Sequence, residues 1–368
     1  MDSRSIAAQF PSNASAISKF EEEHMYTRRE FGQILGAGLP LAMLLRRANP
    51  DVDGVKLGAI TYSFNDMPNM LGQDHVDSVI EDCKGCGVAL IELMSNHVEP
   101  VTEYQMQQAA ARAARMAAMA AANASGAGAQ AGAAGAPGAG RGGVGRGMTP
   151  EALRARDDLR EWRLLTPVSH FEDIKKKFDD AGIVIYAYCM NGLGDDFTPQ
   201  EIDKCFEQAQ ALGAVVMSTS TTLAVAQKLV PFVEKHQFPI AFHGHANITD
   251  PNQFATPESF QKAMAMTKYF KINLDIGHFT GANFDAVPFI EANHANITHM
   301  HVKDGTHNNG PIMPDGQGDT PIKAAMQLLK KNQWPIPAVA EFEYKIPAGS
   351  NSVQEVAKMI QYMKDCLA

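Results

Sequence analysis

The sequence predicts an α/β fold, a closed (β/α)8 barrel of the TIM type, and three observations carry this prediction. Short apolar runs alternate with helical stretches from residue 56 to the C-terminus, which is the pattern of repeated parallel βα units. Several runs end in His, Asp or Glu side chains, and parallel barrels carry their chemistry at the carboxyl ends of their strands. No G-x-G-x-x-G motif follows the first run, which argues against an open dinucleotide-binding sheet.

Length and composition fit one catalytic domain with additions. The chain has 368 residues, and a barrel of about 250 residues accounts for most of them. Apolar residues make up 45% and charged residues 20%, so a large core is expected. The net charge of −9 and the lack of a Lys/Arg run oppose nucleic-acid binding. The five cysteines, including a C-K-G-C pair at 83–86, are too scattered for a disulfide framework.

The first 50 residues have the layout of a leader with a twin-arginine export signal. Residues 27–31, T-R-R-E-F, precede an apolar run at 34–45, as in such signals. The run is shorter than the roughly 20 apolar residues that span a bilayer, so we expect no stable membrane span. The leader predicts an exported, periplasmic protein; the alternative is a leader helix that stays in the cytoplasm.

The barrel domain is expected over residues 55–368, with short strands and capped helices. Strands one to five are predicted at 56–62, 88–94, 183–189, 214–219 and 239–243, and strands six to eight lie within 271–278, 297–304 and 338–344. Thr-Pro pairs at 198–199 and 256–257 predict helix starts, and Glu201 would complete a capping box at the first. The last helix is expected at 352–367.

A low-complexity and helical insertion, residues 105–165, interrupts the barrel after strand two. Ala and Gly dominate its middle, and we expect 123–147 to be a disordered loop. Thr149 and Pro150 then open a helix that runs to about residue 162. Because βα loops leave from the active-site face, the ordered parts are candidates for a lid. An insertion without function explains the composition equally well.

Four consecutive strand ends carry side chains that bind divalent metals. The alternation of side chains along a strand puts His299, His301 and Lys303 on one face, and it pairs Glu341 with Glu343. The other polar residues at these ends are His243 and His245 on strand five and Asp275 and His278 on strand six. Oxygen and imidazole donors from different strands that meet at one barrel mouth predict a divalent-metal site.

Other polar residues at the barrel mouth are candidates for catalysis or substrate binding. Glu92, at the end of strand two, is a candidate substrate ligand or second base, with a structural salt bridge as the alternative. Lys303 is expected to bind a substrate oxygen or stabilise an enolate, unless it forms an ion pair with Asp304 or Glu341. His97 is a candidate contact for sugar hydroxyls.

Four motifs give the chain a resemblance to a known family: L-D-I-G-H at 274–278, H-M-H-V-K-D at 299–304, G-D-T-P-I at 318–322 and E-F-E-Y at 341–344. It resembles the sugar phosphate isomerase/epimerase group of xylose isomerase-like barrels, in particular an exported branch with a twin-arginine leader. The resemblance implies Asp275, His301 and Glu341 as metal ligands and His278 as a substrate contact. His243 stands where related sugar 3-epimerases have a glutamate ligand, and Glu343 remains an alternative to Glu341.

The resemblance implies a divalent-metal-dependent isomerase or epimerase of a sugar or sugar derivative, which abstracts a proton α to a carbonyl and passes through an ene-diolate. Manganese or zinc is the expected ion, and magnesium, cobalt and iron are compatible with the donors. The imidazole at position 243 argues against symmetric two-base epimerisation, because a metal-bound histidine is a poor base. Glu341, Glu343, Glu92 and Lys303 remain the catalytic candidates, and His278, His245 and His97 the substrate-binding ones.

Three other functions stay open at this point. A lyase would use the same proton abstraction for β-elimination on a 3-keto-glycoside. A non-catalytic, exported sugar-binding module would keep the pocket without the reaction. An apurinic endonuclease, which shares the barrel, is opposed by the acidic net charge. The expected partner is a small carbohydrate, and a homodimer is a state that barrels of this kind often adopt, although no residue pattern here indicates it.

Overall fold

The computed structural model describes residues 51–111, 149–190 and 192–368. The expected leader and most of the expected insertion therefore lie outside the described residues. Within the described ranges, no helix has the length and apolar character needed to cross a membrane.

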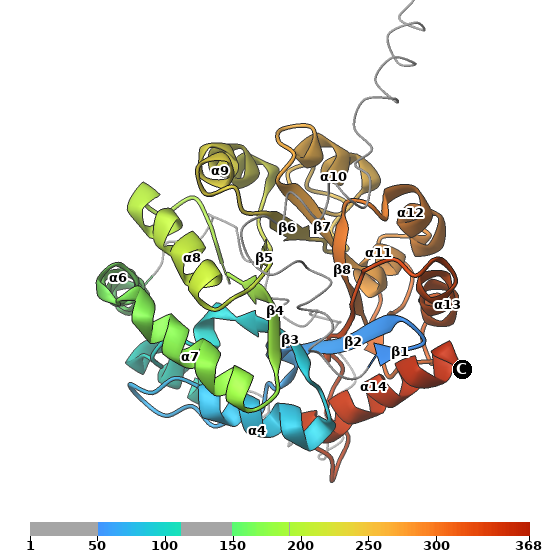
Figure 1. Cartoon of the computed structure of the whole chain (residues 1–368), viewed down its shortest axis with the longest axis horizontal. Coiled ribbons are helices and arrows are strands. Elements are labelled where there is room, and N and C mark those ends of the chain that lie inside the picture. The colour runs from blue at the N-terminus through green and yellow to red at the C-terminus, as the bar shows by residue number, and fades with distance from the viewer. Residues whose placement is uncertain (1–50, 112–148, 191) are drawn as a thin grey trace, which may run out of the picture.

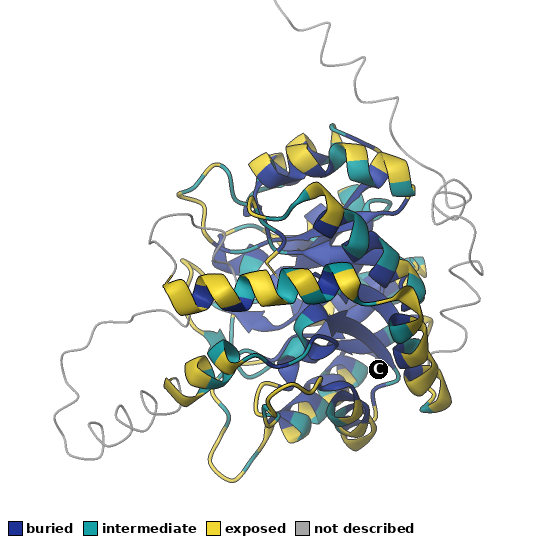
Figure 2. Cartoon of the chain, turned by 90° about the vertical axis from the view of Figure 1, so that its left-hand side faces the viewer, coloured by how far each residue is buried: buried dark blue, intermediate teal, exposed yellow. Residues whose placement is uncertain are grey.

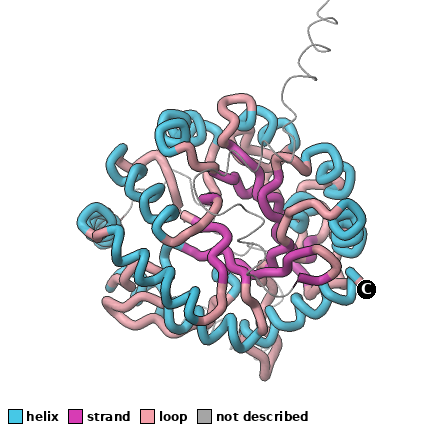
Figure 3. The backbone as a smooth tube through the Cα atoms, viewed as in Figure 1, coloured by secondary structure: helices cyan, strands magenta, loops and turns pink. Residues whose placement is uncertain are grey.

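The described strands close into a parallel barrel (Figures 1 and 3). Around the sheet the order is β2-β11-β8-β7-β6-β5-β4-β3, and a β2–β3 pairing closes the ring. A short strand, β1 (Asp51–Val52), pairs antiparallel with β2 outside the ring. The parallel strands are β2 (Val55–Ile60), β3 (Leu90–Met94), β4 (Val184–Cys189), β5 (Val216–Thr219), β6 (Ile240–His243), β7 (Phe270–Asp275), β8 (Ile297–Val302) and β11 (Ala338–Ala340). The closed parallel barrel predicted from the sequence is confirmed.

Helices surround the barrel, and their outer faces carry the exposed residues (Figures 1 and 2). They are α4 (Val76–Cys86), α6 (Pro150–Leu165), α7 (Val168–Asp180), α8 (Pro199–Ala211), α9 (Leu223–His236), α10 (Pro257–Met264), α11 (Ile276–Gly281), α12 (Ala286–Asn293), α13 (Ile322–Asn332) and α14 (Ser352–Leu367). Short 3-10 turns, η1 (Thr61–Ser63) and η2 (Ser95–His97), follow β2 and β3, and a small hairpin joins β9 (Asp304–Gly305) to β10 (Ile312–Met313).

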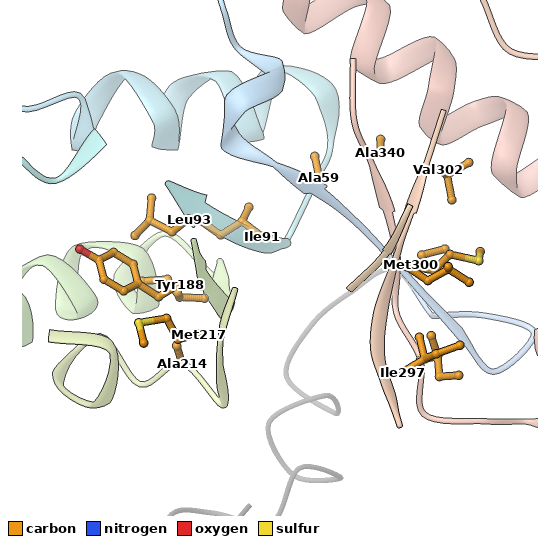
Figure 4. Packing of buried hydrophobic residues seen from close by; sticks show 14 of the residues in the cluster. Ala59, Ile91, Leu93, Tyr188, Ala214, Met217, Ile297, Met300, Val302 and Ala340 are labelled. Carbon is orange, nitrogen blue, oxygen red and sulfur yellow. The ribbon is translucent and has the colours of Figure 1, made fainter. Parts of the chain in front are cut away.

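The largest apolar core lies between the strands and the helix ring. Large apolar side chains are the main favourable contribution to folding, at about 25 cal/mol per Å² buried. Core residues on the strands, and Ala214 just before β5, are labelled in Figure 4: Ala59, Ile91, Leu93, Tyr188, Ala214, Met217, Ile297, Met300, Val302 and Ala340. Alternate strand residues face the barrel interior, where a smaller apolar layer contains Leu90, Tyr186 and Val216.

Local capping signals mark the starts of α8 and α10. Thr198 caps α8, with its hydroxyl accepting from the Glu201 amide at 3.2 Å. The Glu201 carboxylate does not complete the predicted capping box, because it accepts hydrogen bonds from Arg160 and Arg163. At α10 the expected cap is present, and Ser259 completes the box with Thr256.

The helix after the insertion is fixed by buried charge. Arg163, on α6, is 7% exposed and donates to Glu99 at 2.6 Å and to Glu201 at 2.7 Å. α6 therefore packs beside α8, at the periphery of the ring (Figure 1). None of its residues lines the pocket at the barrel mouth described below.

Candidate active site

Four buried side chains from consecutive strands converge at the carboxyl end of the barrel. His243 ends β6, Asp275 ends β7, His301 lies on β8, and Glu341 follows β11 directly. One donor atom from each lies within 4.8 Å of all the others. His243 Nε2 is 3.2 Å from Asp275 Oδ2 and 3.5 Å from Glu341 Oε2, and His301 Nδ1 is 3.0 Å from Glu341 Oε2. We call these four residues the ligand cluster.

The chemistry and spacing of the ligand cluster fit a divalent ion. Two imidazoles and two carboxylates suit zinc, manganese, cobalt or iron. Bonds of about 2.1 Å place neighbouring donor atoms roughly 3.0 to 3.4 Å apart. Three of the separations between the donor atoms, 3.2, 3.5 and 3.0 Å, are close to this spacing.

A second strand-end feature, Lys303, brings a cation to the same place. Its side chain is 1% exposed, and its ammonium group donates to Asp275 at 2.9 Å, Glu341 at 2.8 Å and Glu343 at 2.5 Å. Its Nζ also lies 3.0 Å from His278 Nε2. Burial lowers the pKa of Lys303, but the three carboxylates outweigh burial and raise it well above its usual value. Lys303 is therefore a permanent positive charge beside the ligand cluster.

The L-D-I-G-H segment folds so that a backbone amide holds one carboxylate oxygen of Asp275. Its Oδ1 accepts from the His278 amide at 2.6 Å and caps α11, which leaves Oδ2 facing His243. Gly277 permits this turn, because a Cβ there would lie 2.6 Å from Lys303 Cγ and 2.7 Å from the Lys303 carbonyl oxygen. The motif thus positions one ligand through a helix cap and a close backbone approach.

A pocket opens above the ligand cluster. Its wall consists of Ile60, Tyr62, Met94, Cys189, Ser220, His243, His245, His301, Glu341 and Glu343. His245 and Glu343, both predicted from the sequence, therefore reach the pocket. His278 lies next to them, with its ring 5.0 Å from that of His245 and its Nε2 3.8 Å from Glu343 Oε2.

Glu92 and His97, two further predicted site residues, also do not line this pocket. Glu92 is 0% exposed and contacts Ser218, His299 and His301 inside the barrel. His97 is buried, and its Nδ1 lies 2.9 Å from the hydroxyl of Thr61. The structure thus gives both residues hydrogen-bonding partners within the protein. Their expected contacts with a substrate stay predictions.

Electrostatics hold Glu341 ionised, ready to bind a cation, but favour a proton on His301. Burial raises the pKa of Glu341, but Lys303 and His301 outweigh it and hold the pKa well below its usual value. Burial lowers the pKa of His301, yet Glu92 and Glu341 raise it to about 10. Burial and the neighbouring cations lower the pKa of His245 well below its usual value. A cation at this site would therefore replace a proton on His301, whereas His245 is neutral.

Sequence reasoning did not single out several residues around the cluster. Ser218 and Ser220 follow one another closely at the end of β5, and Asn273 lies two residues before Asp275. Cys189 and Met94, at the ends of β4 and β3, complete the pocket wall. Strand position is the signal that could have found them, since each lies at the carboxyl end of a barrel strand.

The fold and this site define a parallel α/β-barrel protein with a histidine and carboxylate cluster at the barrel mouth. The chain belongs to the xylose isomerase-like TIM barrel family, whose model matches residues 146–366. No curated protein sequence matches the chain.

Solved structures share the barrel at low sequence identity. A xylose isomerase domain protein from Alicyclobacillus acidocaldarius superposes with a TM-score of 0.52 and 8% identity, over 85% of this chain and 99% of that one. The IolI protein with a bound zinc atom gives 0.51 and 14%, over 85% and 98%. The 3-keto-D-glucoside 4-epimerase YcjR from E. coli gives 0.50 and 11%, over 85% and 100%. These similarities show a common fold.

Proposed function

We propose that this chain is a divalent-metal-dependent isomerase or epimerase of a sugar or sugar derivative, which acts by abstracting a proton next to a carbonyl. One observation carries the proposal: a carboxylate outside the ligand cluster, Glu343, lines the pocket directly beside it. The barrel thus supplies a place for a cation and a separate acid–base group at one mouth. Family membership supports the same class of chemistry.

The ligand cluster would hold the ion through His243, Asp275, His301 and Glu341. When bound, a divalent ion supplies Lewis-acid polarisation of a substrate carbonyl. The zinc atom in the similarly folded IolI protein agrees with this assignment. Zinc or manganese remains the expected ion.

Glu343 is the residue that we assign as the base. Its side chain is 15% exposed, the largest value among the carboxylates around Lys303. The Lys303 ammonium group, 2.5 Å away, holds the Glu343 carboxylate in one direction at the pocket wall.

The pocket favours a reaction that needs one base. Among its described lining residues the carboxylates are Glu341 and Glu343, and Glu341 belongs to the ligand cluster. The other described lining residues include Tyr62, Met94 and Cys189. A single base can remove a proton and return it to the neighbouring carbon, which is isomerisation. The same observation favours the second candidate, β-elimination from a 3-keto-glycoside, because that reaction also begins with one proton abstraction.

The charges at the pocket support an uncharged carbohydrate over a sugar phosphate. No arginine is present among the described pocket-lining residues. Lys303 is already paired with three carboxylates and is 1% exposed. A phosphate would therefore meet no unpaired cation of the protein in this pocket. An exported enzyme would encounter such neutral sugars.

Export through the twin-arginine leader is part of the proposal and has its own test. Replacing Arg28 and Arg29 by lysine should keep the protein in the cytoplasm if the leader acts as proposed.

The test combines metal content with α-proton exchange in heavy water on uncharged keto- and aldo-sugars and on 3-keto-glycosides. We expect about one equivalent of a divalent ion in the parent and in Glu343→Gln, and little in Asp275→Asn. Exchange should fall by about 100-fold or more in Glu343→Gln. Glu172→Gln, an exposed residue on α7, is the matched control and should change neither quantity.

Two results would contradict the proposal. If the folded parent protein binds no divalent ion, the proposed metal-dependent reaction is ruled out. Metal-loaded protein that binds a sugar tightly without any exchange would favour the non-catalytic binding module. If exchange occurs, release of the aglycone from a 3-keto-glycoside separates the lyase from the isomerase.

A further inference from the structure

A buried carboxylate lies directly beneath the ligand cluster. Glu92, on β3, is 0% exposed and reaches across the barrel interior to β8. Its Oε2 lies 2.5 Å from His301 Nε2 and 3.0 Å from His299 Nε2. Its Oε1 accepts a hydrogen bond from the hydroxyl of Ser218. Both oxygens are thus engaged by residues of other strands, and the carboxylate is fixed in one orientation.

The spacing favours a hydrogen-bonded unit over a second metal site for Glu92, His299 and His301. Donor atoms around a common ion with bonds of about 2.1 Å stand roughly 3.0 to 3.4 Å apart. The 2.5 Å separation between Glu92 Oε2 and His301 Nε2 is too short for two ligands of one ion and indicates a direct, short hydrogen bond between the two groups. The trio is therefore a hydrogen-bonded unit that shares His301 with the ligand cluster above it.

This contact decides which nitrogen of His301 faces the ligand cluster. An ionised carboxylate only accepts hydrogen bonds, so a proton on Nε2 is needed at 2.5 Å from Glu92. Nδ1 is then the nitrogen that faces the ligand cluster, 3.0 Å from Glu341 Oε2, and an ion bound there would take the place of the proton between these two atoms. The opposite tautomer would accept from the Asn273 amide, 3.1 Å from Nε2. The shorter distance to a charged group favours Glu92 as the partner.

We infer that Glu92 is a positioning residue, which fixes the tautomer and ring direction of His301 so that Nδ1 serves as the metal ligand. The inference rests on the proposed function, since it concerns the ion that the ligand cluster would hold. Carboxylates that accept from the outer nitrogen of a ligand histidine typically contribute about 10- to 100-fold to metal affinity. Glu92 needs no contact with the substrate for this role, which agrees with its complete burial.

Two measurements test the inference. The first is the dissociation constant of Zn²⁺ or Mn²⁺, from competition with a chromophoric chelator, for the parent, Glu92→Gln and the surface control Glu172→Gln. Glu92→Gln keeps the shape but replaces the ionised acceptor, and we expect affinity to fall by about 10-fold or more. The control should match the parent.

The second measurement is the ¹⁵N NMR spectrum of the His301 ring in the zinc-loaded parent, which requires no variant to fold. We expect a proton on Nε2 and the metal on Nδ1. A metal on Nε2, or an unchanged dissociation constant in Glu92→Gln, would overturn the inference while leaving the proposed function intact. Absence of any metal binding by the folded parent would overturn both.

Discussion

Lys303 offers the sharpest test of how the site balances its charges. Lys303→Met keeps a long side chain but removes the ammonium group that pairs with Asp275, Glu341 and Glu343. Without an ion, three carboxylates then face one another with only histidine as a cation. Breaking a buried ion pair by removing one partner costs about 3 to 5 kcal/mol.

The expected loss is large enough to measure by thermal unfolding. For domains of this size 1 kcal/mol shifts the melting temperature by about 2 to 4 °C, so chelator-treated Lys303→Met should melt roughly 6 to 20 °C below the parent. Saturating Mn²⁺ or Zn²⁺ should recover a large part of this deficit, because Asp275 and Glu341 also belong to the ligand cluster. The shift produced by metal should therefore be larger in the variant than in the parent.

A surface lysine provides the control. Lys176 pairs with Asp180 at 2.5 Å, but its side chain is 70% exposed, so Lys176→Met should leave the melting temperature unchanged with and without metal. An equal deficit for Lys303→Met in chelator and in saturating metal would refute the reasoning, since it would mean that Lys303 and the ion do not act on the same carboxylates.

Three other predictions concern the scaffold. Arg163→Met should lower the free energy of unfolding by about 3 kcal/mol, measured by urea titration, because Glu99 and Glu201 are buried against it; an unchanged midpoint would contradict this. Gly277→Ala should cost about 1 to 3 kcal/mol and weaken metal binding, because its Cβ would lie 2.6 Å from Lys303 Cγ; wild-type metal affinity would argue otherwise. Asp315 has two buried oxygens without a hydrogen-bond partner in the described structure, and burial, with Asp304 adding to it, raises its pKa to about 7. Because this pKa lies above the unfolded value of about 3.9, the folded state binds the extra proton, so stability should fall as pH rises from about 4 to about 7. Asp315→Asn should flatten that part of a urea-midpoint profile, and a profile identical to that of the parent would exclude Asp315 as its cause.

Much of the fold could be predicted because its signals are local. The Thr-Pro pairs mark the starts of α8 and α10, and the last helix, α14 (Ser352–Leu367), has the predicted bounds. The predicted strands are longer than the observed ones at several ends. β11 stops at Ala340 because the Phe342 amide turns away and donates to Ser63 Oγ at 3.0 Å. A partner 279 residues away in the chain is invisible to a local pattern.

The sequence by itself determined which side chains face the barrel interior, since alternation along a strand fixes the face of each residue. It therefore predicted the convergence of His243, Asp275, His301 and Glu341 from four strand ends. Alternation does not fix depth along the barrel axis or the partner across it. Only the tertiary structure separated Glu341, in the ligand cluster, from Glu343 at the pocket wall.

The same physical reason explains Glu92. Its position at the end of an apolar strand indicated an inward-facing carboxylate, but its neighbours come from β5, β7 and β8 on other sides of the barrel. Which of these contacts form depends on strand tilt and register around the closed sheet. Those quantities belong to the whole barrel and are encoded in no single segment, so the enclosed position of Glu92 beneath His301 emerged only from the folded chain.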